Sequence, residues 1–237
     1  MTERTTPAGV DAPEPLAPDA APGSGKGSGN GSANGSGTGS VTTLARLTAR
    51  DLVNVAIFAV IYFAIVYAIA MLGIINPLVM LLTLPLSVIA AGIPYMLFLT
   101  RVRRPGMITL FGFVIGVLYL LAGHPWISTL VTVAVAILAE VIVRLGQYRS
   151  RRAAIGAHAV FSLWFVGPMI PLMLNREEYL GSPGMQAMGP EYVAEFDRVF
   201  TTTALAIYGG ATVVCGLLGG LLGAYLLRKH FTRAGLA

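Results

Sequence analysis

The feature that most constrains the fold is an uncharged, apolar stretch that runs from Leu52 to Ile74. A hydrocarbon core of roughly 30 Å requires about 20 consecutive apolar residues in a helix, and this stretch is long enough. In lipid every backbone N–H and C=O group must be hydrogen-bonded within the segment, so the stretch must be helical. The sequence therefore predicts a membrane-spanning helix here.

The composition supports a membrane protein over a soluble one. Hydrophobic residues make up 55% of the chain and charged residues only 11%, whereas a soluble domain carries about 25% charged residues. The single cysteine, Cys215, excludes a disulfide framework and a cysteine-based zinc site. The net charge of +5 does not indicate nucleic-acid binding, because the basic residues cluster at the ends of apolar runs.

The chain divides into two regions of different composition. Residues 1–43 are rich in Pro and Ala and then in Gly and Ser, and such a segment buries too little apolar surface to offset its conformational entropy. We expect a disordered cytoplasmic tail there. Residues 44–237 are expected to form the transmembrane domain.

Five more apolar segments follow the first one, and they are separated by turn residues or by charges. The second segment contains Pro85, Gly92 and Pro94, so we expect a kinked or broken helix. The expected spans after Leu52–Ile74 are residues 78–100, 107–122, 127–146, 153–174 and 200–227, with a long polar connection at 175–198.

The distribution of Lys and Arg predicts the topology. Only Arg176 and Arg198 fall on one side of the expected spans. The other side holds Arg46, Arg50, Arg101, Arg103, Arg104, Arg144, Arg149, Arg151, Arg152, Arg228, Lys229 and Arg233. The sequence therefore predicts an all-α membrane protein with six transmembrane helices and both termini in the cytoplasm.

Small residues recur at helical spacing in the first and last spans. Ala56, Val60, Ala64 and Ala68 are four residues apart, and such a strip allows close approach of another helix. The strip fits either packing within this protein or docking of a partner. The glycines of the last span (Gly216, Gly219, Gly220 and Gly223) are expected to pack internally.

Ionisable groups inside the spans are few. Glu140 lies one helical turn before Arg144, so we predict a structural ion pair near the cytoplasmic end, with contact to a partner as the alternative. His158 is expected to hydrogen-bond a neighbouring helix. An acid/base site made of Glu140 and His158 stays open as an alternative, but no third group is placed to activate water. We therefore predict no catalytic residues, no cofactor and no metal.

The side opposite the arginines carries the candidates for ligand binding. A small-molecule site needs an apolar, aromatic wall and a few polar groups that orient the ligand. For the aromatic residues the alternative is the interfacial belt, where Trp and Tyr are common. The candidate ligand-binding residues are Asn76, His124, Trp126, Trp164, Asn175, Tyr192, Glu195 and Tyr208.

Four segments carry a resemblance to a known family. They are IPYMLFLTRVRRPG at 93–106, LAEVIVRLGQYRS at 138–150, the pair Glu191-Tyr192, and LLRKHFTRAG at 226–235. The chain resembles, over about residues 48–236, the Trep_Strep (MptD-type) membrane proteins. These are regarded as substrate-binding S components of energy-coupling-factor (ECF) transporters.

The resemblance implies a function without catalysis. An S component captures a vitamin-like micronutrient or its precursor outside the bacterial plasma membrane. It then docks on a transmembrane scaffold subunit that two ATPase subunits drive. The resemblance also implies that the strip Ala56, Val60, Ala64 and Ala68 contacts the scaffold. The partners expected are thus the scaffold, the two ATPases, a small molecule and the lipid bilayer.

Two rival functions remain compatible with the sequence. The first is a stand-alone carrier of a small solute, although no internal repeat supports an inverted-repeat carrier. The second is an intramembrane enzyme that uses Glu140 and His158.

Overall fold

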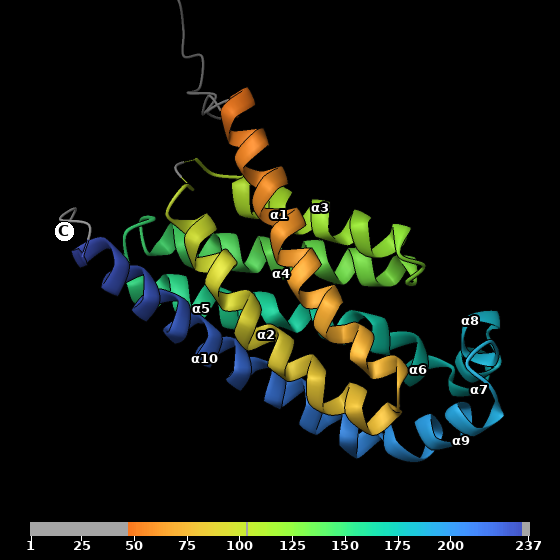
Figure 1. Ribbon diagram of the computed structural model, residues 1–237. Coiled ribbons are helices and arrows are strands. Elements are labelled where there is room, and N and C mark those ends of the chain that lie inside the picture. Colours follow the sequence, from red (N-terminus) through yellow and green to blue (C-terminus); the bar gives the residue numbers. More distant parts are fainter. Residues whose placement is uncertain (1–46, 103, 234–237) are drawn as a thin grey trace, which may run out of the picture. The chain divides into compact units, whose positions relative to one another are not determined.

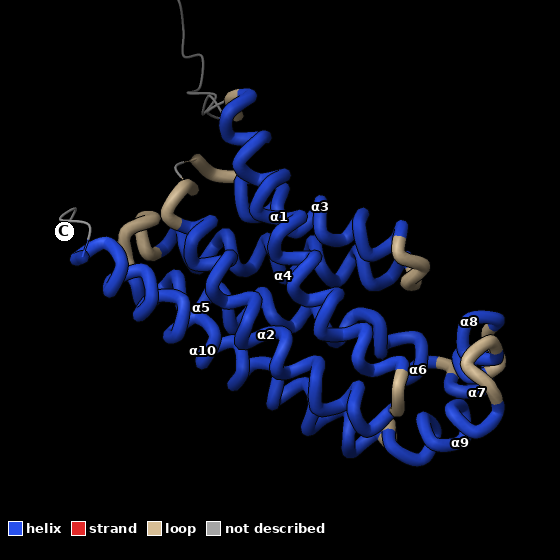
Figure 2. Tube along the Cα trace, viewed as in Figure 1, coloured by secondary structure: helices blue, strands red, loops and turns tan. Residues whose placement is uncertain are grey.

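The computed structural model describes residues 47–102 and 104–233, and all regular structure in these ranges is helical (Figures 1 and 2). The tail predicted at 1–43 lies outside the described residues. Within the described ranges, five helical segments are long and apolar enough to cross a membrane. These are Ala49–Ile74, Pro77–Leu99, Trp126–Leu145, Arg151–Leu174 and Thr202–Lys229.

The remaining expected span is the helix α3 (Met107–Leu121), which is apolar but has only 15 residues. At 1.5 Å per residue it is roughly 22 Å long, which is shorter than the hydrocarbon core. The structure therefore gives five long spans and one short apolar helix.

Local signals explain where the first two long helices begin. In α1 (Ala49–Ala70), Thr48 and Asp51 form a capping box, and a short 3₁₀ helix, η1 (Met71–Ile74), extends the span. In α2 (Pro77–Leu99), the Asn76 side chain accepts a hydrogen bond from the Leu78 amide at 2.7 Å, and Pro77 occupies the first helical position.

The second span is not broken, contrary to one of the two alternatives expected from its sequence. Pro85 and Pro94 both lie inside the continuous helix α2. Each proline removes one backbone donor, but neighbouring helices restore the packing around a membrane helix, so such prolines are tolerated there.

The fifth span is less regular than expected. It consists of α5 (Arg151–Phe161), a 3₁₀ stretch η2 (Ser162–Met169) and α6 (Ile170–Leu174). Pro168 and Pro171 lack the amide hydrogen that an α-helix needs, which accounts for the change of helix type. The fourth span, which precedes this one, is α4 (Trp126–Leu145). The connection after α6 contains three short helices, namely α7 (Arg176–Leu180), α8 (Pro183–Gln186) and α9 (Pro190–Val199).

Glycines let the last helix, α10 (Thr202–Arg233), pack closely between α2 and α5 (Figure 1). A Cβ atom at Gly219 would lie 2.9 Å from the Val88 carbonyl oxygen, and one at Gly223 would lie 2.6 Å from that of Gly92. Gly216 and Gly220 face α5 in the same way. The internal packing predicted for these glycines is confirmed.

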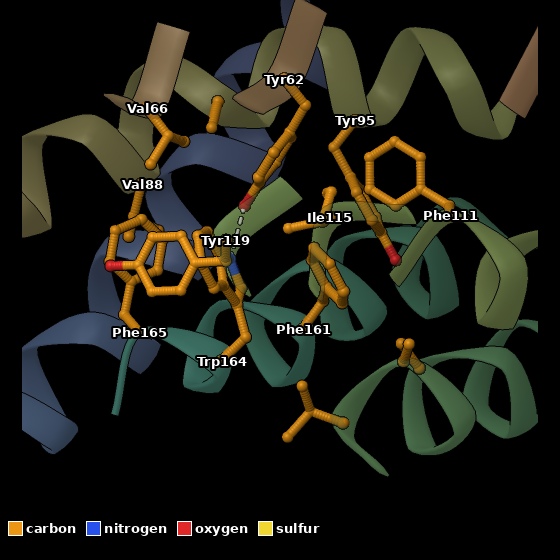
Figure 3. Packing of buried hydrophobic residues seen from close by; sticks show 14 of the residues in the cluster. Tyr62, Val66, Val88, Tyr95, Phe111, Ile115, Tyr119, Phe161, Trp164 and Phe165 are labelled. Carbon is orange, nitrogen blue, oxygen red and sulfur yellow. Dashed lines mark hydrogen bonds between the residues drawn. The ribbon is translucent and has the colours of Figure 1, made fainter. Parts of the chain in front are cut away.

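An aromatic cluster fills the centre of the bundle (Figure 3). Tyr62 from α1 lies edge-on to Phe111, with the ring centroids 5.5 Å apart, and Phe161 stacks on Tyr95 at 5.3 Å. The indole nitrogen of Trp164 donates a hydrogen bond of 3.1 Å to the Tyr62 hydroxyl. This cluster joins α1, α2, α3, α5 and η2 into one core.

Candidate functional site

A pocket of about 650 Å³ opens at the end of the bundle opposite the arginine-rich turns. One wall is the turn between α3 and α4, and the other is the segment from α6 to α8. Figure 1 shows both segments at the same end of the bundle. The side chains that matter for its chemistry are those of His124, Trp126, Asn175, Glu178, Tyr179 and Met185.

The α3–α4 turn holds His124 against the aromatic core. Gly123 adopts a left-handed conformation with φ of 91°, which ends α3. The His124 ring then stacks on Tyr119 with the centroids 3.7 Å apart and the planes nearly parallel. Burial lowers the pKa of His124 to about 4, so the imidazole is neutral at neutral pH.

Trp126 forms the rim of the same wall. It is the first residue of α4, and 66% of its side chain is exposed. A large aromatic surface at the mouth of a pocket is available for stacking on a planar ligand.

The opposite wall is fixed by the polar interactions of Asn175 and Arg176. Asn175 accepts a hydrogen bond from the Glu178 amide and donates one to the Glu178 carboxylate at 2.8 Å. Arg176 joins α7 to the end of α9, because its guanidinium contacts the Asp197 carboxylate and the Phe200 carbonyl oxygen. The pocket wall is thereby connected to the start of α10.

The pocket is lined mainly by apolar groups, and its polar groups carry no positive charge. No Lys or Arg belongs to its lining in the part of the chain that the structure describes, and Glu178 is the acid that lines it. An anionic ligand would find no counter-charge there. The lining therefore suits a neutral or cationic molecule with a flat, apolar part.

The eight candidate ligand-binding residues fall into three groups. His124, Trp126 and Asn175 line the pocket. Trp164 and Tyr208 are buried in the core, where their polar atoms bond Tyr62 and the Phe165 carbonyl oxygen. Trp164 contacts Tyr119 edge-on with the centroids 5.0 Å apart, and Tyr119 in turn stacks on the lining residue His124.

The third group connects α9 to the turn between α1 and α2. The Asn76 amide donates a hydrogen bond of 2.9 Å to the Glu195 carboxylate, and the Tyr192 hydroxyl donates one of 3.0 Å to the Gly73 carbonyl oxygen. Burial raises the pKa of the Tyr192 hydroxyl, so it stays a donor. These residues hold the α7–α9 segment in place and do not line the pocket.

The small-residue strip of α1 lies on the exposed face of that helix. Ala56, Val60, Ala64 and Ala68 are all exposed. The buried residues of α1, including Tyr62 and Val66, face α2 and α3 instead. The strip is therefore not used for packing within the described chain.

Glu140 does not form the ion pair with Arg144 that its spacing predicts. No ion pair joins the two among the described residues; the Glu140 carboxylate instead accepts hydrogen bonds from the amides of Gly106, Ile108 and Thr109 at 3.0, 2.9 and 3.0 Å. The Tyr148 hydroxyl donates a further one at 3.0 Å. The free amides and the positive end of the helix dipole at the start of α3 therefore bind the Glu140 carboxylate in preference to the exposed Arg144.

His158 bonds a neighbouring helix, as predicted: its Nδ1 atom lies 2.7 Å from the Gly216 carbonyl oxygen of α10. No hydrogen bond links it to Glu140 within the described residues. Nor do those residues contain a group of three or more His, Cys, Asp and Glu side chains that could hold a metal ion.

Comparison with protein families gives a match over residues 49–233, to a description that reads hypothetical bacterial integral membrane protein (Trep_Strep). The chain belongs to the Trep_Strep family. It is therefore a multi-pass membrane protein of a bacterial family, in agreement with its apolar helices. Neither the curated proteins nor the solved structures gave a match.

Three features of this Trep_Strep pocket were not foreseen. Tyr119 supports His124, and Ser182 and Met185 contribute to the lining. Tyr119 and His124 are five residues apart across a helix end, which is a spacing without a regular periodicity. Met185 lies in a short helix within a polar stretch, so no periodic pattern indicated its burial.

Proposed function

We propose that this protein is the substrate-binding S component of an ECF-type importer in the bacterial plasma membrane. It captures a vitamin-like micronutrient or precursor and delivers it together with a transmembrane scaffold and two ATPase subunits. The proposal includes six membrane spans with both termini in the cytoplasm, with the short helix α3 counted as the sixth.

The observation that carries the proposal is the pocket at the arginine-poor end of the bundle. Twelve Lys and Arg residues flank the other ends of the helices, whereas Arg176 and Arg198 are the two on the pocket side. Since basic loops remain in the cytoplasm, the pocket faces outward. A pocket of about 650 Å³ has the size of a small-molecule site.

The exposed strip of α1 supports a partner in the membrane. Alanines four residues apart allow two helix backbones to approach closely, and lipid alone does not require small residues there. Ala64 and Ala68 lie in the second half of α1, and both are exposed. We assign the scaffold contact to this strip.

The test is co-purification followed by uptake. Affinity-tagged protein from its native host should retain an integral membrane scaffold and ATPases. Replacement of Ala64 or Ala68 by Trp should remove these partners and stop ATP-dependent uptake, but leave ligand binding by the isolated protein intact.

Leu130→Trp is the matched control, because Leu130 is also exposed on an apolar helix but lies on α4. This variant should keep its partners. If both alanine variants still co-purify with the scaffold and transport normally, the strip is not the docking site.

A further inference from the structure

A second pocket, of about 370 Å³, lies at the arginine-rich end of the bundle. It is formed where the end of α2, the α4–α5 turn and the end of α10 meet (Figure 1). The lining residues used below are Met96, Leu99, Tyr148, Arg149, Arg151 and Arg228. None of them belongs to the ligand pocket described above.

Arginines form the charged part of this pocket. Arg149 and Arg151 are exposed, and neither takes part in an ion pair among the described residues. Arg228 adds a third guanidinium from α10. Glu140 accepts a hydrogen bond from the lining residue Tyr148, but it does not line the pocket and is already bonded to backbone amides at the start of α3.

The backbone of the α4–α5 turn is in a conformation that non-glycine residues rarely adopt. Gln147 and Tyr148 have φ values of 52° and 56°, in the left-handed region. The hydrogen bond from the Tyr148 hydroxyl to Glu140 stabilises this turn, and burial together with Glu140 raises the pKa of Tyr148 to about 12. A strained backbone of this kind persists only where the surrounding contacts hold it in place. In this turn the strained conformation places Tyr148 in one wall of the pocket and Arg149 at the rim.

The other walls are apolar. Met96 and Leu99 come from the last turns of α2, and Ala224 and Leu227 come from α10. The two helices are in close contact just below, where a Cβ on Gly223 would lie 2.8 Å from the Met96 side chain. The pocket thus combines a cationic rim at the membrane surface with an apolar floor at membrane depth.

We propose that this pocket binds the phosphodiester headgroup of an anionic phospholipid in the cytoplasmic leaflet. Arg149 and Arg151 would each donate paired hydrogen bonds to phosphate oxygens, for which the planar guanidinium is suited. The upper part of an acyl chain lies along Met96, Leu99 and Leu227. Basic pockets between helices on the cytoplasmic side commonly bind such lipids.

The test uses purified full-length protein in a neutral detergent, with native mass spectrometry and melting temperature as readouts. Phosphatidylglycerol should bind and raise the melting temperature. Phosphatidylcholine, which has the same chains and no net charge, should do so far less. Glycerol 3-phosphate, which has a phosphate and no chains, separates a soluble phosphate ligand from a lipid.

The decisive variants are Arg149→Gln and Arg151→Gln. Each should weaken phosphatidylglycerol binding about fivefold, which corresponds to about 1 kcal/mol per arginine, and the double variant about twenty-five-fold. Arg152→Gln is the matched control: Arg152 is an exposed neighbour on the same helix but does not line the pocket. Its affinity should equal that of the unmodified protein.

Three results would overturn the proposal. One is equal binding of phosphatidylglycerol by the unmodified protein and the double variant. Another is an equal loss in Arg152→Gln, which would indicate a diffuse charge effect. The third is full protection by glycerol 3-phosphate alone, which would assign the pocket to a soluble phosphate compound.

Discussion

Substitution of Glu140 by Gln should destabilise the protein more than any other change of a single acid in the described chain. Gln has the same size, but it offers one acceptor oxygen instead of two and turns an NH₂ group toward donors. One carboxylate oxygen accepts from the Gly106 amide and the Tyr148 hydroxyl, and the other from the amides of Ile108 and Thr109. At least one backbone amide therefore loses its acceptor whichever way the Gln side chain turns, since only the Tyr148 hydroxyl can turn to accept from the NH₂ group, and the remaining bonds go to a neutral group.

The magnitude follows from the lost bond and from the weakening of the others. Hydrogen bonds to charged groups contribute about 1.5–3 kcal/mol each and those between neutral groups about 0.5–1.5 kcal/mol, so one lost and three weakened bonds should lower the free energy of unfolding by about 3–6 kcal/mol. In a domain of this size about 1 kcal/mol shifts the melting temperature by about 2–4 °C, which predicts a decrease of at least about 6 °C. Tyr148→Phe removes one bond and should cost about half as much.

The assay is thermal unfolding in detergent combined with amide hydrogen exchange. Exchange at Ile108 and Thr109 should become faster in Glu140→Gln, because these amides lose their acceptor. Glu191→Gln is the control, since Glu191 is exposed on α9, and it should change stability by less than about 0.5 kcal/mol. Equal melting temperatures for Glu140→Gln and Glu191→Gln would refute the capping role of Glu140.

Three other predictions concern packing, pH and the pocket. Gly219→Ala should lower the free energy of unfolding by about 1–3 kcal/mol, because its Cβ would lie 2.9 Å from the Val88 carbonyl oxygen. In the control Gly210→Ala the new Cβ meets no atom within 4 Å, so the melting temperature should stay the same or rise. The His124 pKa of about 4 lies below the ordinary 6.5, so the folded state binds fewer protons than the unfolded one and stability should be lost as pH falls from 6.5 to 4. Between pH 7.5 and 5 a His124→Gln variant should lose less stability than the unmodified protein. An equal loss of stability would exclude His124 as the cause. The chain has two tryptophans, and only Trp126 lines the pocket, so the fluorescence change on ligand binding should vanish in Trp126→Phe and persist when Trp164 is replaced by Phe.

The membrane spans could be predicted from the sequence because lipid imposes length and apolarity on a helix. The boundaries of α1, α3 and α4 differ from the expected ones by only a few residues. The fifth span was predicted, but its 3₁₀ stretch was not, because hydropathy does not distinguish an α-helix from a 3₁₀ helix. Pro168 and Pro171 were the available signals. Of the kink or break expected in α2, the break did not occur, since helix packing overrides proline's local preference.

The candidate site was less predictable, because it depends on which side chains the turns bring together. His124, Trp126 and Asn175 meet in one pocket although they lie in two separate connections. Tyr192 and Glu195 are also aromatic or polar residues in a connection on the same side of the membrane. They do not line the pocket, because Tyr192 bonds the Gly73 carbonyl oxygen and Glu195 bonds Asn76. The predicted ion pair between Glu140 and Arg144 was wrong for a similar reason. Periodicity places the two residues on one helix face, but it cannot show that the amides at the start of α3 lie within hydrogen-bond distance of the carboxylate.

The most direct test of the proposed function is reconstitution of the protein in lipid vesicles, alone and together with its co-purified scaffold and ATPases. The ligand should bind to the protein alone, and it should accumulate inside the vesicles only when the partners and ATP are present. Accumulation of the solute by the protein alone would contradict the proposed function and would establish an independent carrier.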